Sequence, residues 1–128
     1  MSSNDPHIAR LEFRELRIPF TVAFRHAAAE RAETSSVWIE AIASDGIVGC
    51  GESCPRPYVT GETLATARTF MSKHEAELRR TVTGVETLLA WVAAHQNGIN
   101  TGPAAWCAIE LAILDLLGKR HRAPVERP

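Results

Sequence analysis

The side chains that could do metal or acid–base chemistry are few in this sequence and lie far apart along it. The histidines are His7, His26, His74, His95 and His121, and the aspartates are Asp5, Asp45 and Asp115. The two lysines are Lys73 and Lys119. Because a metal site gathers several ligands at close spacing, we predict no metal site and no catalytic lysine pair in this chain.

The spacing of glycines and cysteines does not indicate phosphate or redox chemistry either. Gly49 and Gly51 are followed by polar residues and two prolines rather than by the start of a helix, unlike a phosphate-binding loop. The cysteines, Cys50, Cys54 and Cys107, include no Cys-x-x-Cys pair. We expect Cys50 and Cys54 to be reduced, half-buried residues near the end of a strand.

The stretch best suited to binding is GCGESCPRPYVTGET, residues 49–63. Its glycine-rich start lets a backbone or a ligand approach closely, and it opens into a proline-bracketed loop that carries Arg56 and Tyr58. One reading is a stiff connection between a sheet and a helix. The other is a semi-rigid loop that presents an aromatic ring and a cation to a partner, at low entropic cost because the prolines already restrict it.

The overall composition is that of one folded domain. The chain has 128 residues, of which 45% are hydrophobic and 23% charged, close to the averages of globular proteins. Its formal net charge of -1 gives no field that would attract nucleic acid. No apolar run approaches the ~20 residues of a membrane span, and the start lacks the apolar core of a signal peptide. We therefore expect a cytoplasmic protein with no nucleic-acid or membrane partner.

The first half of the chain shows the two-residue alternation of β-strands. Within residues 7–20 the alternation changes parity, so we predict a bulged strand or two short strands, ending at Pro19. The apolar residues on the two faces are Leu11 and Phe13 against Leu16, Ile18 and Phe20. After a loop over residues 21–35, we predict strands over residues 35–44 and 47–53, joined by a hairpin at Asp45–Gly46, where both central positions tolerate positive φ.

The second half changes to helical spacing. The first predicted helix covers residues 60–80, with Thr60 as its N-cap and Glu62 at the positive end of its dipole. The second begins at Thr83 and ends at Asn97–Gly98.

A third helix is predicted from Pro103 to about Gly118. It is apolar nearly all round, so it must be buried on most sides. Strands followed by helices predict an α+β fold, a three-stranded antiparallel β-meander followed by a bundle of about three α-helices.

Four strings in this order and spacing resemble the N-terminal domain of a known enzyme group. They are IPFTVAFRHAAAERAETSSVWIE, DGIVGCGES, RPYVTGET and AAWCAIELAILDLLGKRHRAPV. Together they resemble the mandelate racemase and muconate lactonizing group of the enolase superfamily, over Ile8 to about Val125. The segments FTVAFRHAAAERAET and PYVTGET resemble those of dipeptide epimerases and muconate cycloisomerases more than those of mandelate racemase.

The resemblance implies a capping domain with two loops that reach over the active site of a following (β/α) barrel. By position these loops are residues 23–29 and 54–60. The implied substrate-binding residues are Phe24, Arg25, His26, Pro55, Arg56 and Tyr58. The two arginines are candidates for binding a substrate carboxylate, because a guanidinium fork fits one.

The implied reaction is abstraction of a proton next to a carboxylate, with Mg²⁺ stabilising the enolate and barrel lysines acting as acid and base. A barrel takes ~250 residues, and this chain ends at Pro128. We expect a disordered start over residues 1–7, a capping domain over residues 8–125 and no barrel in this chain. We therefore expect no catalytic residue and no metal ligand here, with Mg²⁺ bound in the parent enzyme's barrel.

The expected partners are a barrel, in cis or in trans, and a small-molecule carboxylate substrate. The end of the chain, APVERP, resembles a linker and favours a domain of an epimerase-like isomerase. Two alternatives are a stand-alone binding or dimerisation module, as a homo-oligomer, and a split enzyme whose barrel is a separate chain.

Overall fold

The computed structural model describes residues 7–19, 33–55 and 61–121, and over these residues three strands are followed by four helices. The predicted α+β fold is confirmed. Residues 1–6 of the predicted disordered start and residues 21–32 of the predicted loop lie outside the described residues. His7 is held by hydrogen bonds to Ser44, and residues 33–35 belong to a strand rather than to the loop. The elements are β1 (Ile8–Pro19), β2 (Glu33–Ala43), β3 (Val48–Ser53), α2 (Leu64–Thr81), α3 (Val85–Ala94), α4 (Gln96–Thr101) and α5 (Pro103–Arg120).

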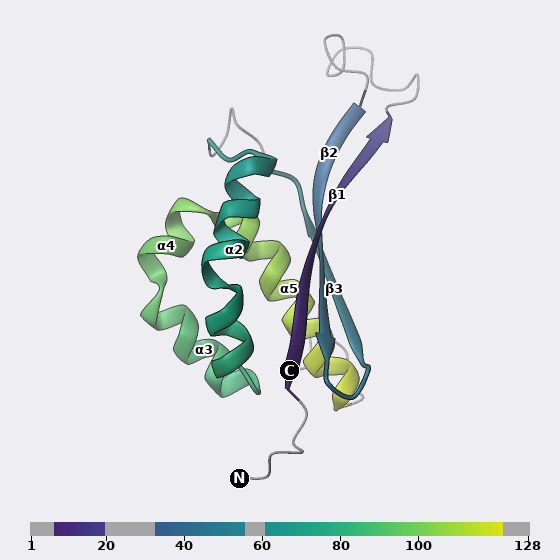
Figure 1. The fold of residues 1–128 in the computed structure, drawn as a ribbon. Coiled ribbons are helices and arrows are strands. Elements are labelled where there is room, and N and C mark those ends of the chain that lie inside the picture. The colour runs from purple at the N-terminus through teal and green to yellow at the C-terminus, as the bar shows by residue number, and fades with distance from the viewer. Residues whose placement is uncertain (1–6, 20–32, 56–60, 122–128) are drawn as a thin grey trace.

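The three strands form one antiparallel sheet in the order β1-β2-β3 (Figure 1). Of the two predictions for β1, one bulged strand is confirmed and two short strands are wrong. The pairing with β2 runs without a shift from Arg10 to Pro19, so no irregularity lies at the parity change between Phe13 and Leu16. The irregularity lies instead between Ile8 and Arg10. Leu16 therefore continues the same strand on the face opposite to Phe13, and the parity change reflects apolar residues on both faces of one long strand.

The hairpin between β2 and β3 lies where Asp45–Gly46 predicted it, with a longer turn. The Gly46 N–H donates to the Ala43 carbonyl, and the Ala43 N–H donates to the Ile47 carbonyl, each at 2.9 Å. Three residues thus separate Ala43 from Ile47, and Gly46 has a φ of 93°. This is the three-residue hairpin that ends in a left-handed residue, rather than the two-residue form.

The two faces of the sheet have different environments. Val37, Ile39 and Ala41, which alternate along β2 and so share one face, are buried beneath the helices. The opposite face carries a ladder of charged side chains from β1 and β2. The Arg10–Glu12, Arg14–Glu12 and Arg14–Glu40 ion pairs measure 3.0, 3.3 and 3.6 Å.

The helices differ from the prediction at their boundaries. Thr63, not Thr60, is the N-cap of α2, where its side chain accepts from the Thr66 N–H in a capping box.

The second predicted helix is two helices, because the helix is interrupted at His95 and continues as α4 through Asn97–Gly98. The cause is local. The His95 N–H donates to the Val92 carbonyl, three residues back, and the Trp91 carbonyl, four residues back, contacts the Nδ1 atom of the His95 ring instead of the His95 N–H.

Helix α5 packs against β3 and β2, and α2 against β1, while α3 and α4 pack on α2 and α5 (Figure 1). A Cβ atom at Gly49 would overlap the backbone of Ala112, and one at Gly51 would overlap that of Ala108. The glycines of β3 therefore let the α5 backbone approach the sheet directly. The helix runs through Gly118 to Arg120, slightly beyond the predicted end.

Two side chains of α5 also cover the free edge of β3. The Asp115 carboxylate accepts from the Cys50 N–H at 2.9 Å, and the Lys119 ammonium donates to the Val48 carbonyl at 2.8 Å. The same two side chains form an ion pair at 3.1 Å. Asp115 and Lys119 thereby supply hydrogen-bond partners to the edge strand, where a neighbouring strand would otherwise supply them. Over the described residues, no helix has both the length and the apolar character that a bilayer crossing requires.

Candidate functional site

Both segments predicted to reach over a substrate leave the sheet at the same end. β1 ends at Pro19 opposite Glu33, where β2 begins. β3 runs antiparallel to β2 and ends at Ser53, opposite Val37, so it points toward that same end (Figure 1). Residues 20–32 and 54–60 are therefore attached at one end of the molecule, as a shared role at a substrate pocket requires.

Of the six predicted substrate-pocket residues, the structure describes Pro55, which is half-buried directly after β3. The others, Phe24, Arg25, His26, Arg56 and Tyr58, lie outside the described residues. Cys50 is half-buried as predicted, and burial raises the pKa of its thiol. Cys54 is exposed rather than half-buried.

The segment between β3 and α2 is fastened at both ends to the first turn of α5. Before the segment, the Ser53 hydroxyl donates to the Ala104 carbonyl. After it, the Glu62 carboxylate accepts from the Ala104 N–H at 2.9 and 3.0 Å and from the Ala105 N–H at 3.1 Å. Both flanks of the segment are thus fixed to one helix end, while Arg56 and Tyr58, on which the two readings of residues 49–63 differ, lie outside the described residues.

Glu62 caps a different helix from the predicted one. It was expected to complement the dipole of the helix that follows it, but its carboxylate lies at the N-terminus of α5. The α5 N-cap is Gly102, which has no side chain to accept from the first N–H groups, and Pro103 follows it. Glu62 supplies that missing acceptor while only 3% exposed.

Gly61 makes the required turn into Glu62. Its φ of 79° lies in the left-handed region, which a glycine adopts without steric cost. The chain therefore changes direction between the predicted loop and the buried Glu62 carboxylate.

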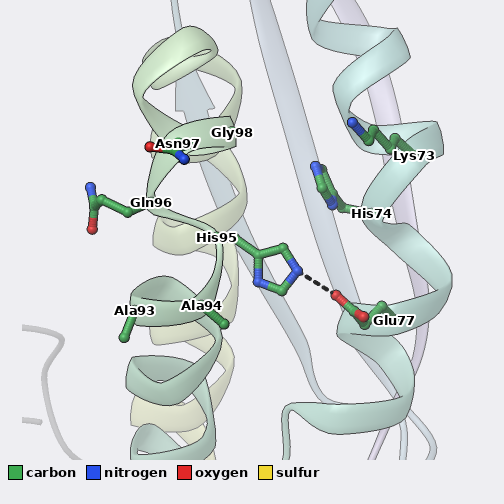
Figure 2. A pocket seen from close by; sticks show the side chains of 9 residues that line it. All are labelled: Lys73, His74, Glu77, Ala93, Ala94, His95, Gln96, Asn97 and Gly98. Atoms are coloured by element: carbon green, nitrogen blue, oxygen red, sulfur yellow. Dashed lines mark ion pairs between the residues drawn. The ribbon is translucent and has the colours of Figure 1, made fainter.

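A second group of titratable side chains lines a cleft of about 530 Å³ between α2 and the junction of α3 and α4 (Figure 2). His74 and Glu77 project from α2, and His95 projects from the junction. One potential ligand atom from each lies within 4.8 Å of the other two. The prediction of scattered histidines is wrong for this group, because helix packing brings His95 to the other two residues.

This group is held by a connected set of polar contacts. The His95 Nε2 atom lies 2.7 Å from the Glu77 Oε1 atom, and the Trp91 indole N–H donates to the same oxygen at 2.9 Å. The His95 Nδ1 atom contacts the Trp91 carbonyl at 2.8 Å. His74 is buried, and burial, followed by the nearby His95 and Lys73, lowers its pKa.

The sequence held only part of the signal for this group. His74 and Glu77 are three residues apart, a spacing that places side chains on one helical face. His95 lies in a different element, and nothing in its local sequence relates it to the other two.

Comparison with known proteins identifies the family. The family described as "Mandelate racemase / muconate lactonizing enzyme, N-terminal domain" matches residues 8–127. The chain is 28% identical over 121 residues to the aromatic dipeptide epimerase of Herpetosiphon aurantiacus, covering 92% of this chain and 33% of that protein. It is 31% identical to the L-Ala-D/L-Glu epimerase of Bacteroides thetaiotaomicron, covering 83% of this chain and 27% of that protein. The chain thus spans about a third of the length of these relatives.

Solved structures agree with this assignment. The dipeptide epimerase of Methylococcus capsulatus, in complex with Mg and the dipeptide L-Arg-D-Lys, superposes with a TM-score of 0.74 at 25% identity. The match covers 94% of this chain and 34% of that one. The chain therefore belongs to the mandelate racemase and muconate lactonizing enzyme family of the enolase superfamily, and it contains the N-terminal domain of that family.

Proposed function

We propose that this chain is the substrate-capping domain of a Mg²⁺-dependent isomerase of the dipeptide epimerase or cycloisomerase type, which abstracts a proton next to a carboxylate. A following (β/α) barrel, in cis or in trans, supplies the reacting groups, and residues 8–125 act as the cap. The names of the relatives support this activity. The observation that carries the capping role is the fastening of both ends of residues 54–61 to the first turn of α5.

The role of this chain's residues is to position the substrate and exclude water. The hydrogen bonds of Ser53 and Glu62 fix the two points from which the segment starts and ends, and fixing a segment at its ends lowers the conformational entropy that substrate binding costs. The segment over residues 20–32 leaves the same end of the sheet, so the two can close over one pocket. Exclusion of water from that pocket strengthens every charge interaction inside it.

Arg25 and Arg56 are the side chains we assign to the substrate carboxylate. Each guanidinium can donate two parallel hydrogen bonds to the two oxygens of a carboxylate. Phe24, His26, Pro55 and Tyr58 would form the walls of the same pocket.

The Mg²⁺ ion belongs to the barrel rather than to this chain. Mg²⁺ prefers six oxygen ligands in octahedral geometry. Among the described residues, the group that gathers potential ligands contains two imidazoles and one carboxylate, which does not fit that preference. No step of the proposed reaction therefore depends on a metal bound by the described residues.

A chimaera tests the proposal directly. The N-terminal domain of the Herpetosiphon aurantiacus relative would be replaced by residues 1–128, and epimerisation of dipeptides would be followed by exchange of the α-proton in D₂O. We expect activity to be restored. We expect Arg25→Ala or Arg56→Ala to raise KM about 10- to 100-fold, the size of one lost hydrogen bond to a charged group.

Arg79→Ala provides the matched control. Arg79 is exposed on α2 and its ion pair is with Glu75, on the same helix. Its removal should leave KM unchanged. Restored activity that is equally insensitive to the loss of Arg25, Arg56 or Arg79 would contradict the assignment of the carboxylate contacts.

Association distinguishes the proposed cap from a stand-alone module. The chain would be mixed with the relative's barrel lacking its own N-terminal domain, and the molar mass would be measured by size-exclusion chromatography with light scattering. A stoichiometric, active complex supports the cap. A stable self-dimer that does not bind the barrel, together with an inactive chimaera, would instead favour a dimerisation module.

A further inference from the structure

We propose that His74, Glu77 and His95 form a binding site for a divalent transition metal ion of the Zn²⁺ class, which ties α2 to the junction of α3 and α4. The site faces a cleft of about 530 Å³ (Figure 2). It uses none of the residues assigned to substrate.

The donor set and its dimensions fit such an ion. Two imidazoles and one carboxylate are the protein ligands of a common class of three-ligand zinc sites, whose fourth position holds water. Ligand atoms about 2.1 Å from a tetrahedral ion lie about 3.4 Å from one another. Here the three ligand atoms lie within 4.8 Å of one another, and the His95–Glu77 pair is at 2.7 Å. Small side-chain rotations would bring all three to the required spacing.

The atoms behind the ligands already hold them in the orientation that a metal needs. A metal-binding histidine commonly donates its other ring N–H to a carbonyl, which fixes the tautomer and leaves the second nitrogen for the ion. The His95 Nδ1 atom lies 2.8 Å from the Trp91 carbonyl, which leaves Nε2 directed at Glu77. The Trp91 indole N–H in turn orients the Glu77 carboxylate.

Aromatic packing makes this arrangement rigid. The Trp91 ring stacks on His95, with centroids 3.9 Å apart, and on Trp106, with centroids 4.9 Å apart. His74 packs against the Trp91 edge at 5.2 Å. Because Trp106 belongs to α5, the orientation of the ligands is anchored in the main core.

His74 is ready to act as a ligand. Within the described residues it makes ring contacts with Phe70, Trp91 and His95 but no hydrogen bond. Burial lowers its pKa, which favours the neutral imidazole that a metal ion binds.

The surroundings favour a transition metal over Mg²⁺ and leave room for a fourth ligand. Imidazole nitrogen suits Zn²⁺, Cu²⁺ and Ni²⁺, whereas Mg²⁺ selects oxygen. Lys73 is the cation that lines the cleft, and its exposed side chain can turn toward solvent when an ion binds. The cleft then provides space for a water molecule opposite the three protein ligands.

Titration of the purified chain with Co²⁺ and Zn²⁺ tests the site. We expect one equivalent of Co²⁺ to produce the visible absorption of a tetrahedral nitrogen and oxygen site, and one equivalent of Zn²⁺ to displace it. His95→Gln and Glu77→Gln should each weaken binding at least tenfold. The control His121→Gln removes an exposed histidine at the end of α5 and should bind as the parent chain does.

Circular dichroism of each variant establishes whether it is folded before its binding is compared. Two variants on different elements protect the test against a local folding defect, because Glu77 lies in α2 and His95 outside it. Binding that survives both substitutions would overturn the proposal. So would thiolate charge-transfer absorption in the Co²⁺ complex, which would assign the ion to the exposed Cys54 or Cys107.

Discussion

Glu62 shows how one buried side chain can connect two elements that are distant in sequence. Its carboxylate lies 42 residues from Ala104 in the chain, yet it accepts the N–H groups of Ala104 and Ala105. The charge lies where the partial positive charge of α5 is concentrated. Glu62 thereby fixes the end of the proposed substrate segment and caps the N-terminus of α5.

Replacing the carboxylate with an amide should weaken this connection. Glu62→Gln should lower the free energy of unfolding by about 1–2 kcal/mol, because a neutral acceptor at a buried helix N-terminus is weaker than a charged one. Urea unfolding followed by circular dichroism measures this loss. The matched control is Glu86→Gln, an exposed acid in the first turn of α3, which should cost about 0.5 kcal/mol. Equal losses in the two variants would contradict the capping role.

At the level of elements, the contact between α5 and β3 organises the domain. The strand has glycines where the helix crosses it. Asp115 and Lys119 of the helix form hydrogen bonds with the backbone at the free edge of the strand. The apolar side of α5 meanwhile fills the core, with Ile109, Ile113 and Leu116 almost completely buried. The near-continuous apolar character of this helix is explained by that position between the sheet and the other helices.

A methyl group at the crossing point should separate the two elements. Gly51→Ala should lower the free energy of unfolding by about 3 kcal/mol, because the new Cβ meets fixed backbone atoms of Ala108 and Ala112 rather than a side chain that can move. Chemical denaturation measures the change. Gly84→Ala is the control, because a Cβ there meets no atom within 4 Å. It should cost about 0.5–1 kcal/mol, as expected at a helix N-cap. A cost for Gly51→Ala no larger than the control's would show that α5 can move away freely.

At the scale of the whole molecule, the domain separates a polar sheet face, a packed core and a sheet end that carries the proposed substrate segments. The proposed function places the reacting groups in a barrel, and the described residues hold one candidate metal group, which suits Zn²⁺ rather than Mg²⁺. The domain should therefore respond differently to the two ions.

Thermal melting of the chain measures that difference. Millimolar Mg²⁺ should leave the melting temperature unchanged, because an ion that does not bind the native state does not stabilise it. Zn²⁺ at a small excess should raise the melting temperature, as the inferred His74–Glu77–His95 site requires, and His95→Gln should abolish the rise. A shift of several degrees with Mg²⁺ would contradict the assignment of that ion to the barrel.

The sequence by itself determined the three strands, the order of strands before helices, and the family, whereas it joined α3 and α4 into one helix. Alternating apolar residues indicate which residues share a strand face, and Asp45–Gly46 indicates a reversal of the chain. Both features can be predicted because they depend on residues that are neighbours in sequence. The same local information placed α5 and its burial nearly correctly. It misplaced the irregularity of β1, which lies between Ile8 and Arg10, because apolar residues on both faces of the strand changed the parity farther along.

Only the tertiary structure decided which polar groups meet. Glu62 precedes α2 and was assigned to it, but the packing of α5 against β3 places the unsatisfied N–H groups of a different helix beside its carboxylate. His95 approaches His74 and Glu77 because its ring bonds to the Trp91 carbonyl and the helix breaks there. Such pairings depend on the positions of whole helices, which residue spacing along the chain does not encode.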